Sequence, residues 1–323
     1  MTDVSDDILR QAALSVAAQH RIDKWLVATP CLHARQSIED GDLYFKAENF
    51  QHTGSFKYRG ALAKLTSLSS DATVITASSG NHGLALATAA RVTGHGLRIV
   101  LPETVAEEKH QAIKALGVET ILYSNDAGQA ELCAQKIARD EGLQYVSPYN
   151  DENVIAGQGT IALELLQQLP SIDSVFIAMG GGGLVSGIGS VFKACSPQTK
   201  VFGVSAINSA ALAASMRAGK VVSVEHLTTL ADGCAGSIAE ETMTLPLATS
   251  VIDEVIECTE LEIAAGLRTL AWQEKMLVEG SAGLAYAAFQ KAAIKGGTCV
   301  VILCGANFDR EVIEPIIATR QQC

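Results

Sequence analysis

Lys57 has the surroundings in this sequence that best suit covalent chemistry. It lies in the stretch 48–60, between a turn of small residues and the start of a predicted helix, with Phe56 and Tyr58 on either side and Arg59 close by. An amine becomes a nucleophile when desolvation or a neighbouring cation lowers its pKa, and these side chains could supply both effects. Such a lysine can form a Schiff base with a carbonyl compound. An isolated lysine is more often an ordinary helix residue, so this interpretation depends on the rest of the chain.

Four consecutive glycines form the second chemical feature. They follow the apolar stretch 174–179, which reads as a buried strand, and they precede a predicted helix. Backbone amides in such a turn, together with a helix N-terminus, form a cradle for a phosphate. A flexible loop is the alternative, but four glycines are entropically costly unless the backbone must closely approach something. We therefore expect a phosphate site at Gly180, Gly181, Gly182 and Gly183.

Two other kinds of phosphate site do not match this glycine run. A P-loop requires Gly-Lys-Ser or Gly-Lys-Thr at its end, whereas Leu184 and Val185 follow Gly183. A dinucleotide site requires a GxGxxG spacing and an acidic residue about 20 positions on, and the glycine spacing fails. A monophosphate ligand remains as the interpretation.

A polar turn follows the predicted strand 73–77 and precedes an alanine-rich helix. A helix cap needs only one polar side chain, and this turn has several. Its backbone amides and hydroxyls therefore suit the binding of a carboxylate. The histidine by itself indicates nothing, since a lone histidine is usually structural. We expect substrate contacts from Ser78, Ser79, Gly80, Asn81 and His82.

Two further residues occupy places where a site could form. Cys304 ends the apolar strand 298–303, and Glu279 stands just before a predicted helix. Taken alone, Cys304 reads as a buried core thiol and Glu279 as a carboxylate favoured by the helix dipole.

Composition narrows the class of protein. The chain has 323 residues, 48% of them hydrophobic, and a formal net charge of -11, which disfavours nucleic acid as a partner. Its eight cysteines are scattered without a CxxC pair, and neither a signal peptide nor a run of transmembrane length is present. We therefore expect a cytoplasmic protein with no membrane partner, no metal and a small-molecule ligand, and its Met- and Ala-rich helices suggest a homo-oligomer, first of all a dimer.

Alternation of strands, polar turns and helices predicts an α/β fold with parallel-sheet cores and helices on both faces. Three strand-helix repeats lie within 71–149, which we expect to form a small, mobile domain. Residues 1–70 and 150–323 form the expected large domain, and the turn-rich segment 147–151 joins the two.

These motifs together resemble the fold-type II pyridoxal-phosphate enzymes of the serine/threonine dehydratase and serine racemase group, whose fold is like that of the tryptophan synthase β-subunit. The stretch 48–60 resembles their lysine motif, 78–83 their substrate loop, 180–183 their tetraglycine loop, and 154–160 a further shared stretch. The resemblance covers nearly the whole chain.

The resemblance implies a role for each motif. Lys57 would bind the cofactor as a Schiff base and remove the Cα proton, and Ser79 would serve the opposite face of the substrate. Asn81 would bond the pyridine 3-hydroxyl, and Cys304 would lie at the pyridine nitrogen as a neutral partner. The implied cofactor-binding set is Phe56, Lys57, Asn81, Gly180, Gly181, Gly182, Gly183, Leu184, Glu279 and Cys304.

The implied reaction is α,β-elimination of water from a β-hydroxy amino acid of the L-threonine or L-serine class, which gives a 2-oxo acid and ammonia. The alternatives are a serine- or aspartate-type racemase, a dehydratase of another substrate such as 3-hydroxyaspartate, a β-replacement synthase, and a sensor without turnover. Side-chain specificity depends on loops such as 232–237.

The sequence also departs from the family pattern. Residues 205–211 contain no acidic side chain where racemases of the group carry metal ligands, so we expect no metal there. An arginine near the racemase substrate is replaced around Ala130. We also expect no C-terminal regulatory domain after Cys323.

Overall fold

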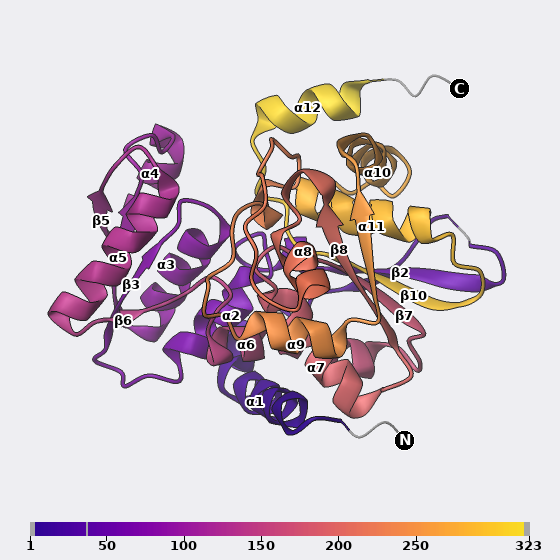
Figure 1. Cartoon of the computed structure of the whole chain (residues 1–323), viewed down its shortest axis with the longest axis horizontal. Coiled ribbons are helices and arrows are strands. Elements are labelled where there is room, and N and C mark those ends of the chain that lie inside the picture. The colour runs from indigo at the N-terminus through magenta and orange to yellow at the C-terminus, as the bar shows by residue number, and fades with distance from the viewer. Residues whose placement is uncertain (1–3, 37, 320–323) are drawn as a thin grey trace.

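Two β-sheets form the framework of the molecule (Figure 1). The computed structural model describes residues 4–36 and 38–319. The larger sheet has the strand order β1-β2-β10-β7-β8-β9, and the smaller sheet has the order β5-β4-β3-β6. Among the described strands, β1 and β2 pair antiparallel and all other neighbours pair parallel. The strands are β1 Cys31–His33, β2 Gly41–Ala47, β3 Thr73–Ala77, β4 Gly96–Leu101, β5 Glu119–Leu122, β6 Gln144–Tyr145, β7 Ser174–Ala178, β8 Lys200–Ala206, β9 Glu254–Cys258 and β10 Gly297–Leu303.

Helices connect most of these strands, as parallel pairing requires. The α-helices are α1 Asp6–Ile22, α2 Lys57–Leu65, α3 Asn81–Thr93, α4 Glu107–Lys114, α5 Ala127–Glu141, α6 Glu152–Gln168, α7 Gly183–Cys195, α8 Ala211–Ala218, α9 Thr244–Val251, α10 Glu260–Trp272, α11 Gly280–Ala292 and α12 Arg310–Ala318. Short 3-10 turns are η1 Asp23–Trp25, η2 Glu48–Phe50, η3 Ile207–Ser209 and η4 Asp232–Cys234.

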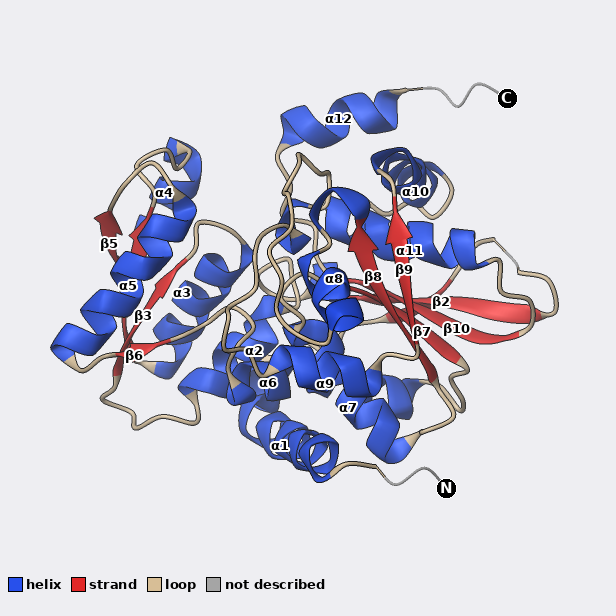
Figure 2. Ribbon diagram, in the orientation of Figure 1, coloured by secondary structure: helices blue, strands red, loops and turns tan. Residues whose placement is uncertain are grey.

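The larger sheet is covered on both faces (Figure 2). Helix α11 packs on β7 and β10 and is backed by α10, while α6 and α7 pack together on the other face. The strand β7 is buried along its whole length, and β10 is buried from Cys299 onward. Apolar strands covered on both faces are typical of parallel sheets.

The smaller sheet is also covered on both faces. Val74 and Ile99 join a cluster that includes α2 and α3, whereas their neighbours Ile75 and Val100 join a cluster with α5. This division follows from the alternation of side chains along a strand.

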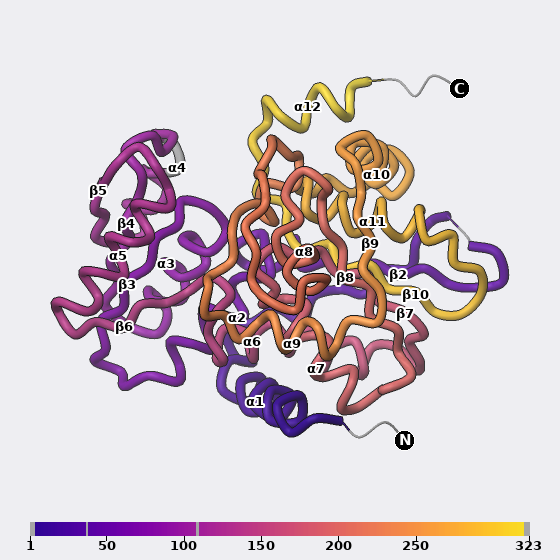
Figure 3. Tube along the Cα trace, viewed as in Figure 1, coloured from indigo at the N-terminus to yellow at the C-terminus, as the bar shows by residue number. Residues whose placement is uncertain are grey.

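Strands from the first and last parts of the chain pair in the larger sheet. Strand β2, near the N-terminus, pairs with β10, near the C-terminus, and the chain builds the smaller sheet between α2 and α6 (Figure 3). The predicted α/β class with parallel-sheet cores is confirmed. The smaller sheet spans residues 73–145, and the domain boundaries and the mobility of this lobe stay predictions. No helix among the described residues is long and apolar enough to cross a membrane.

Candidate active site

Three adjacent strands carry the predicted motifs to one edge of the larger sheet. β10 pairs parallel with β2 on one side and with β7 on the other. The lysine turn follows the end of β2, Cys304 follows β10, and the glycine loop follows β7 after Met179. Because parallel strands end at the same edge, the three motifs meet there, as ligand sites in open α/β sheets commonly do.

Backbone hydrogen bonds join the lysine turn to the end of β10. The Phe56 N–H donates to the Cys304 carbonyl at 3.0 Å, and the Ala306 N–H donates to the Gly54 carbonyl at 2.9 Å. Gly54 has a φ of 72°, which favours glycine, and a Cβ there would lie 2.7 Å from Oδ1 of Asn307. The first residue of α2 is therefore fixed relative to Cys304.

The Lys57 amine has the lowered pKa that a nucleophile needs. Burial lowers the pKa of Lys57 to about 8, and the nearby Cys234, Cys304 and Glu279 partly oppose this shift. The amine donates to the Pro148 carbonyl at 2.8 Å and lies 5.2 Å from the centre of the Phe56 ring. Desolvation is thus the effect that activates this amine, and Arg59 contributes elsewhere.

Cys304 and Glu279 form a buried pair beside this amine. The Cys304 thiol donates to Oε1 of Glu279 at 3.5 Å. Burial, together with the neighbouring carboxylate, raises the pKa of Cys304 well above its ordinary value, so the thiol is protonated and neutral. Burial also raises the pKa of Glu279, although hydrogen bonds from Asn81 oppose this effect.

Asn81 reaches this pair from the smaller sheet. Its Nδ2 donates to both oxygens of Glu279, at 3.2 and 3.0 Å, and its Oδ1 accepts from Nδ2 of Asn307 at 2.7 Å. Asn81 is the first residue of α3, whereas Glu279 precedes α11, which packs on the larger sheet, and Asn307 follows β10 of that sheet. The asparagine therefore links the two lobes at the site.

The glycine loop is packed so tightly that side chains would not fit. A Cβ on Gly180 would lie 2.8 Å from the backbone of Cys234, and a Cβ on Gly181 would meet the ring of Tyr149. Gly182 has a φ of 89°, which favours glycine. Within the described residues, the N–H groups of 181–184 make no hydrogen bond, and N–H groups at a helix N-terminus can bind an anion.

The polar turn after β3 has its serines at the partly exposed end and its histidine buried inside the smaller lobe. The Ser79 hydroxyl makes no hydrogen bond within the described part of the chain, and Ser78 accepts from the Gly80 N–H at 3.3 Å. The His82 ring is buried and hydrogen-bonded through Nε2 to the Val146 carbonyl at 3.2 Å. Burial lowers the pKa of His82 to about 3, so this imidazole is neutral and packed inside the lobe.

Several residues that support the site carry no motif in the sequence. Tyr149, Asn150, Thr244 and Asn307 contact the glycine loop, its covering segment or Asn81. Only the turn-rich composition of 147–151 gave a signal, because these contacts join segments that are far apart in the sequence.

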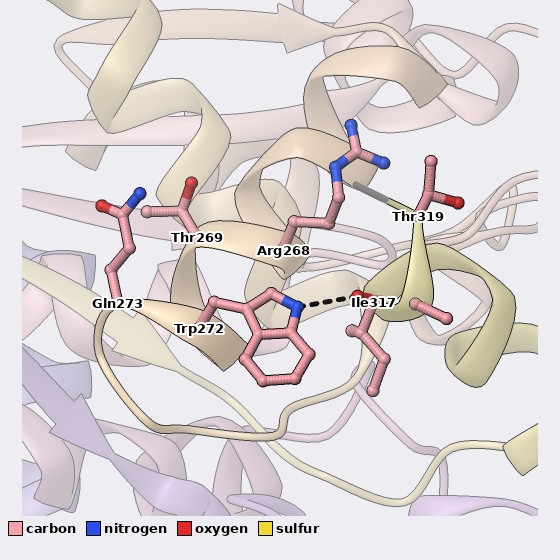
Figure 4. A pocket seen from close by; sticks show the side chains of 7 residues that line it. Arg268, Thr269, Trp272, Gln273, Ile317 and Thr319 are labelled. Atoms are coloured by element: carbon pink, nitrogen blue, oxygen red, sulfur yellow. Dashed lines mark hydrogen bonds between the residues drawn. The ribbon is translucent and has the colours of Figure 1, made fainter. Parts of the chain in front are cut away.

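A separate pocket of about 460 Å³ lies between α10 and the end of α12 (Figure 4). Trp272 Nε1 donates to the Ile317 carbonyl there at 2.7 Å. The lining is Arg268, Thr269, Trp272, Gln273, Ile317, Ala318 and Thr319, which includes none of the site residues above.

The residues at the strand ends fit pyridoxal phosphate. An activated amine, a glycine cradle with free amides, and a protonated thiol match its aldehyde, its phosphate and a neutral partner for its ring nitrogen. Among the described residues, no group of three or more His, Cys, Asp or Glu is arranged to hold a metal ion.

Comparison with known proteins agrees with this chemistry. Residues 22–305 match the family described as "Pyridoxal-phosphate dependent enzyme". The chain is 38% identical over 284 residues to the L-threonine ammonia-lyase of Thermotoga maritima, covering 87% of this chain and 71% of that protein. Solved structures with similar folds include threonine deaminase isoform 2 from Solanum lycopersicum, with TM-score 0.88 and 31% identity over 97% of this chain and 88% of that chain. Maize serine racemase has TM-score 0.87 and 28% identity over 94% and 95%. The chain therefore belongs to the family of pyridoxal-phosphate dependent enzymes.

Proposed function

We propose that the protein is an ammonia-lyase that eliminates water from a β-hydroxy amino acid of the L-threonine or L-serine class. The observation that carries this proposal is the amine of Lys57, whose pKa of about 8 is set by burial where three strand ends meet. Names of relatives, such as L-threonine ammonia-lyase, support the same substrate class.

Several residues would hold the cofactor. Lys57 would bind it covalently, the N–H groups of residues 181–184 would take its phosphate, and Phe56 would pack beside its ring. Asn81 would bond the ring hydroxyl, and Cys304 would face the ring nitrogen with Glu279 next to it. The bound cofactor supplies an electron-withdrawing ring that acidifies the Cα–H bond of an attached amino acid.

Lys57 is the group that would remove the Cα proton. With a pKa near 8, Nζ is a stronger acceptor at neutral pH than a carboxylate and less fully protonated than an ordinary lysine. The Pro148 carbonyl, 2.8 Å away, orients the amine when it is protonated.

The turn after β3 would bind the substrate carboxylate. The N–H groups of Asn81, His82 and Gly83 begin α3 and make no hydrogen bond within the described residues, so they are available to an anion. The Ser78 and Ser79 hydroxyls and the exposed Gly80 complete this turn. His82, neutral and bonded to Val146, would support the turn from inside the lobe.

Cys304 would favour elimination. Its protonated thiol would be a neutral partner for the ring nitrogen of the cofactor, so the ring would withdraw electrons less strongly than one with a protonated nitrogen. Loss of a β-hydroxyl suits such a ring better than a reaction that needs a strong electron sink.

A racemase is the second candidate, because the Ser79 hydroxyl makes no hydrogen bond within the described residues. A hydroxyl on the opposite face of the substrate from Lys57 could return a proton with inverted geometry. Similarity to maize serine racemase supports this candidate at the level of the fold.

The test is release of 2-oxo acid from L- and D-serine, L- and D-threonine and 3-hydroxyaspartate, with pyridoxal phosphate added and chiral analysis of the remaining substrate. Prompt oxo acid from L-threonine or L-serine supports the proposal. Inverted substrate with little oxo acid favours the racemase. Oxo acid from 3-hydroxyaspartate alone would make that amino acid, not threonine or serine, the substrate of the lyase. No conversion of any substrate contradicts both the lyase and the racemase.

We also propose a cytoplasmic homodimer. The seven cysteines of the described residues are free, which suits a reducing compartment. Leu261, Trp272 and Leu277 are 82%, 61% and 53% exposed along α10 and the segment after it, which offers an apolar surface for a second copy. Sedimentation equilibrium would give the mass, and a monomer at micromolar concentration would exclude the dimer.

A further inference from the structure

A segment without regular structure runs beside the glycine loop. We call residues 235–243, which connect η4 to α9, the strap (Figure 3). Most of its residues are exposed, and Ile238, at 7% exposure, is its one buried residue. A segment this exposed keeps one position only if specific contacts hold it.

Two residues of the junction between the lobes hold the second half of the strap. The Tyr149 hydroxyl accepts from the Ala239 N–H at 2.7 Å. The Asn150 amide donates from Nδ2 to the Glu241 carbonyl at 2.9 Å, and its Oδ1 accepts from the Met243 N–H at 3.0 Å. Asn150 thus binds strap backbone on both sides of Thr242.

The end of the strap is tied directly to the glycine loop. The hydroxyls of Thr242 and Thr244 are 2.8 Å apart, and the Thr244 hydroxyl donates to the Gly181 carbonyl at 2.6 Å. The ring of Tyr149 packs on Gly181, where a Cβ would clash with it. A displaced strap would therefore disturb the backbone whose amides face the proposed phosphate.

The same junction touches the reacting lysine and the smaller sheet. The Pro148 carbonyl accepts from Lys57 Nζ at 2.8 Å. Val146 donates its N–H to the Ile75 carbonyl at 2.9 Å and accepts from the Thr76 hydroxyl at 2.8 Å. Along the segment 146–150, Val146 contacts the smaller sheet and Pro148 contacts Lys57. Tyr149 contacts the glycine loop, and Asn150 contacts the strap.

We propose that Asn150 is a positioning residue that seats the strap on the glycine loop and thereby slows release of the phosphate-bearing cofactor. The inference rests on the proposed use of the glycine loop as the phosphate site. The Asn150 side chain touches no reacting group, yet it would contribute measurably to retention of the cofactor.

The test uses Asn150→Ala and two readouts that need no amino-acid substrate. The first is the rate of cleavage by a glutamate-specific protease after Glu240 or Glu241, both exposed in the strap. The second is the rate of pyridoxal-phosphate loss from the diluted holoenzyme, followed by absorbance. Loss of the hydrogen bonds of one amide should raise both rates by about tenfold to a hundredfold. The global unfolding midpoint should change little.

Asn208→Ala is the matched control. Asn208 lies in η3 and is also half-buried, and its Nδ2 donates to the Thr228 carbonyl at 2.6 Å. The neighbouring Ser209 accepts from the Gly236 N–H at the start of the strap, so Asn208→Ala removes an amide hydrogen bond next to the strap without removing one to it. Both rates should stay at the wild-type values. If Asn150→Ala does not fold, Thr244→Val is the second variant, because it removes the link to Gly181 and keeps the shape of the side chain.

Three results would overturn the proposal: unchanged cleavage in a folded Asn150→Ala, faster cleavage without faster cofactor loss, or equal effects from Asn208→Ala. Failure of the lyase proposal gives a different result, since a wild-type protein that binds cofactor but converts no amino acid leaves both readouts measurable. A chain that binds no cofactor at all would contradict the phosphate site itself.

Discussion

At the scale of single residues, the site depends on taking one amine out of water. Burial lowers the pKa of Lys57 and so activates its amine. Glu279 and the thiols of Cys234 and Cys304 raise this pKa and only partly offset the effect of burial. The same burial keeps Cys304 protonated. One desolvated edge of the sheet thus provides a proton acceptor and a neutral partner within the same space.

Lys57→Ala should abolish both covalent cofactor binding and turnover. The reason is that Lys57 is the amine beside Cys304 and Glu279. Burial also lowers the pKa of Lys46 at the end of β2, but that amine is paired with Glu164. The visible absorbance of the bound cofactor should disappear, and activity should fall by at least about 10³-fold, near the range for loss of a general base. Lys64→Ala, on the far end of α2, is the control, and its cofactor absorbance should remain. Full activity in Lys57→Ala would remove the lysine from the mechanism.

His82 makes the folded protein sensitive to acid. Burial holds its pKa at about 3 in the folded state, compared with 6.5 when unfolded, so the unfolded state binds more protons between these values. The stability that it contributes is present above pH 6.5 and is lost as pH falls toward 3.

His82→Gln should therefore flatten the loss of stability in acid. At pH 7 the variant should lose about 1 kcal/mol through the weakened bond to Val146. Between pH 6.5 and 4 the wild type should lose up to about 3 kcal/mol that the variant keeps. Urea unfolding at several pH values measures both, with the exposed His20→Gln as control. Parallel curves for wild type and His82→Gln would contradict a neutral buried imidazole.

At the scale of elements, the lysine turn is closed by a buried ion-pair cluster. Arg59 donates from Nε and Nη2 to both oxygens of Glu48, at 2.7 and 2.9 Å, and from Nη1 to Glu164 at 2.6 Å. Lys46 completes the cluster through Glu164. Burial raises the pKa of Glu164, but Arg59 and Lys46 outweigh it and hold the carboxyl ionised. The bidentate pair of Glu48 and Arg59 joins the two ends of the segment that carries Lys57.

Glu48→Gln should destabilise the protein by about 3–5 kcal/mol, because it leaves a buried guanidinium short of negative charge. Glu314→Gln, which breaks an exposed pair with Arg310, should cost under about 0.5 kcal/mol. Denaturant unfolding of the two variants compares them directly. Similar small losses would show that the buried cluster does not restrain the turn.

The sequence predicted the local motifs of the site but not the contacts between distant segments. Strand ends and glycine runs are local signals, so the lysine turn, the glycine loop and the Ser78 turn could be placed from their own residues. The role of Arg59 was misjudged, because its guanidinium was expected to act on Lys57 and instead pairs with Glu48 and Glu164. Contacts such as that of Asn150 with Glu241 depend on how distant segments pack, which no local pattern contains.

At the scale of the whole molecule, Asn81 links the smaller sheet to the edge of the larger one. Asn81, at the start of α3, is hydrogen-bonded to Glu279 at the start of α11 and to Asn307 after β10. One face of the smaller sheet packs in an apolar cluster with α1, α2 and α6, and the other face packs with α5, so its fold does not depend on this link. The link therefore bears on the relative position of the lobes more than on their stability.

Asn81→Asp should weaken the approach of the two lobes more than Asn81→Ala does. The new carboxylate would face Glu279 in a buried place, so repulsion adds to the lost hydrogen bonds. We expect a larger radius of gyration by X-ray scattering and a cofactor affinity reduced by more than about tenfold in Asn81→Asp, with smaller changes in Asn81→Ala. Because like charges can be relieved by protonation, lowering the pH toward 5 should return Asn81→Asp to the dimensions of Asn81→Ala. Equal dimensions for both variants at every pH would mean that the lobes are held together by their other contacts and that Asn81 serves the cofactor alone.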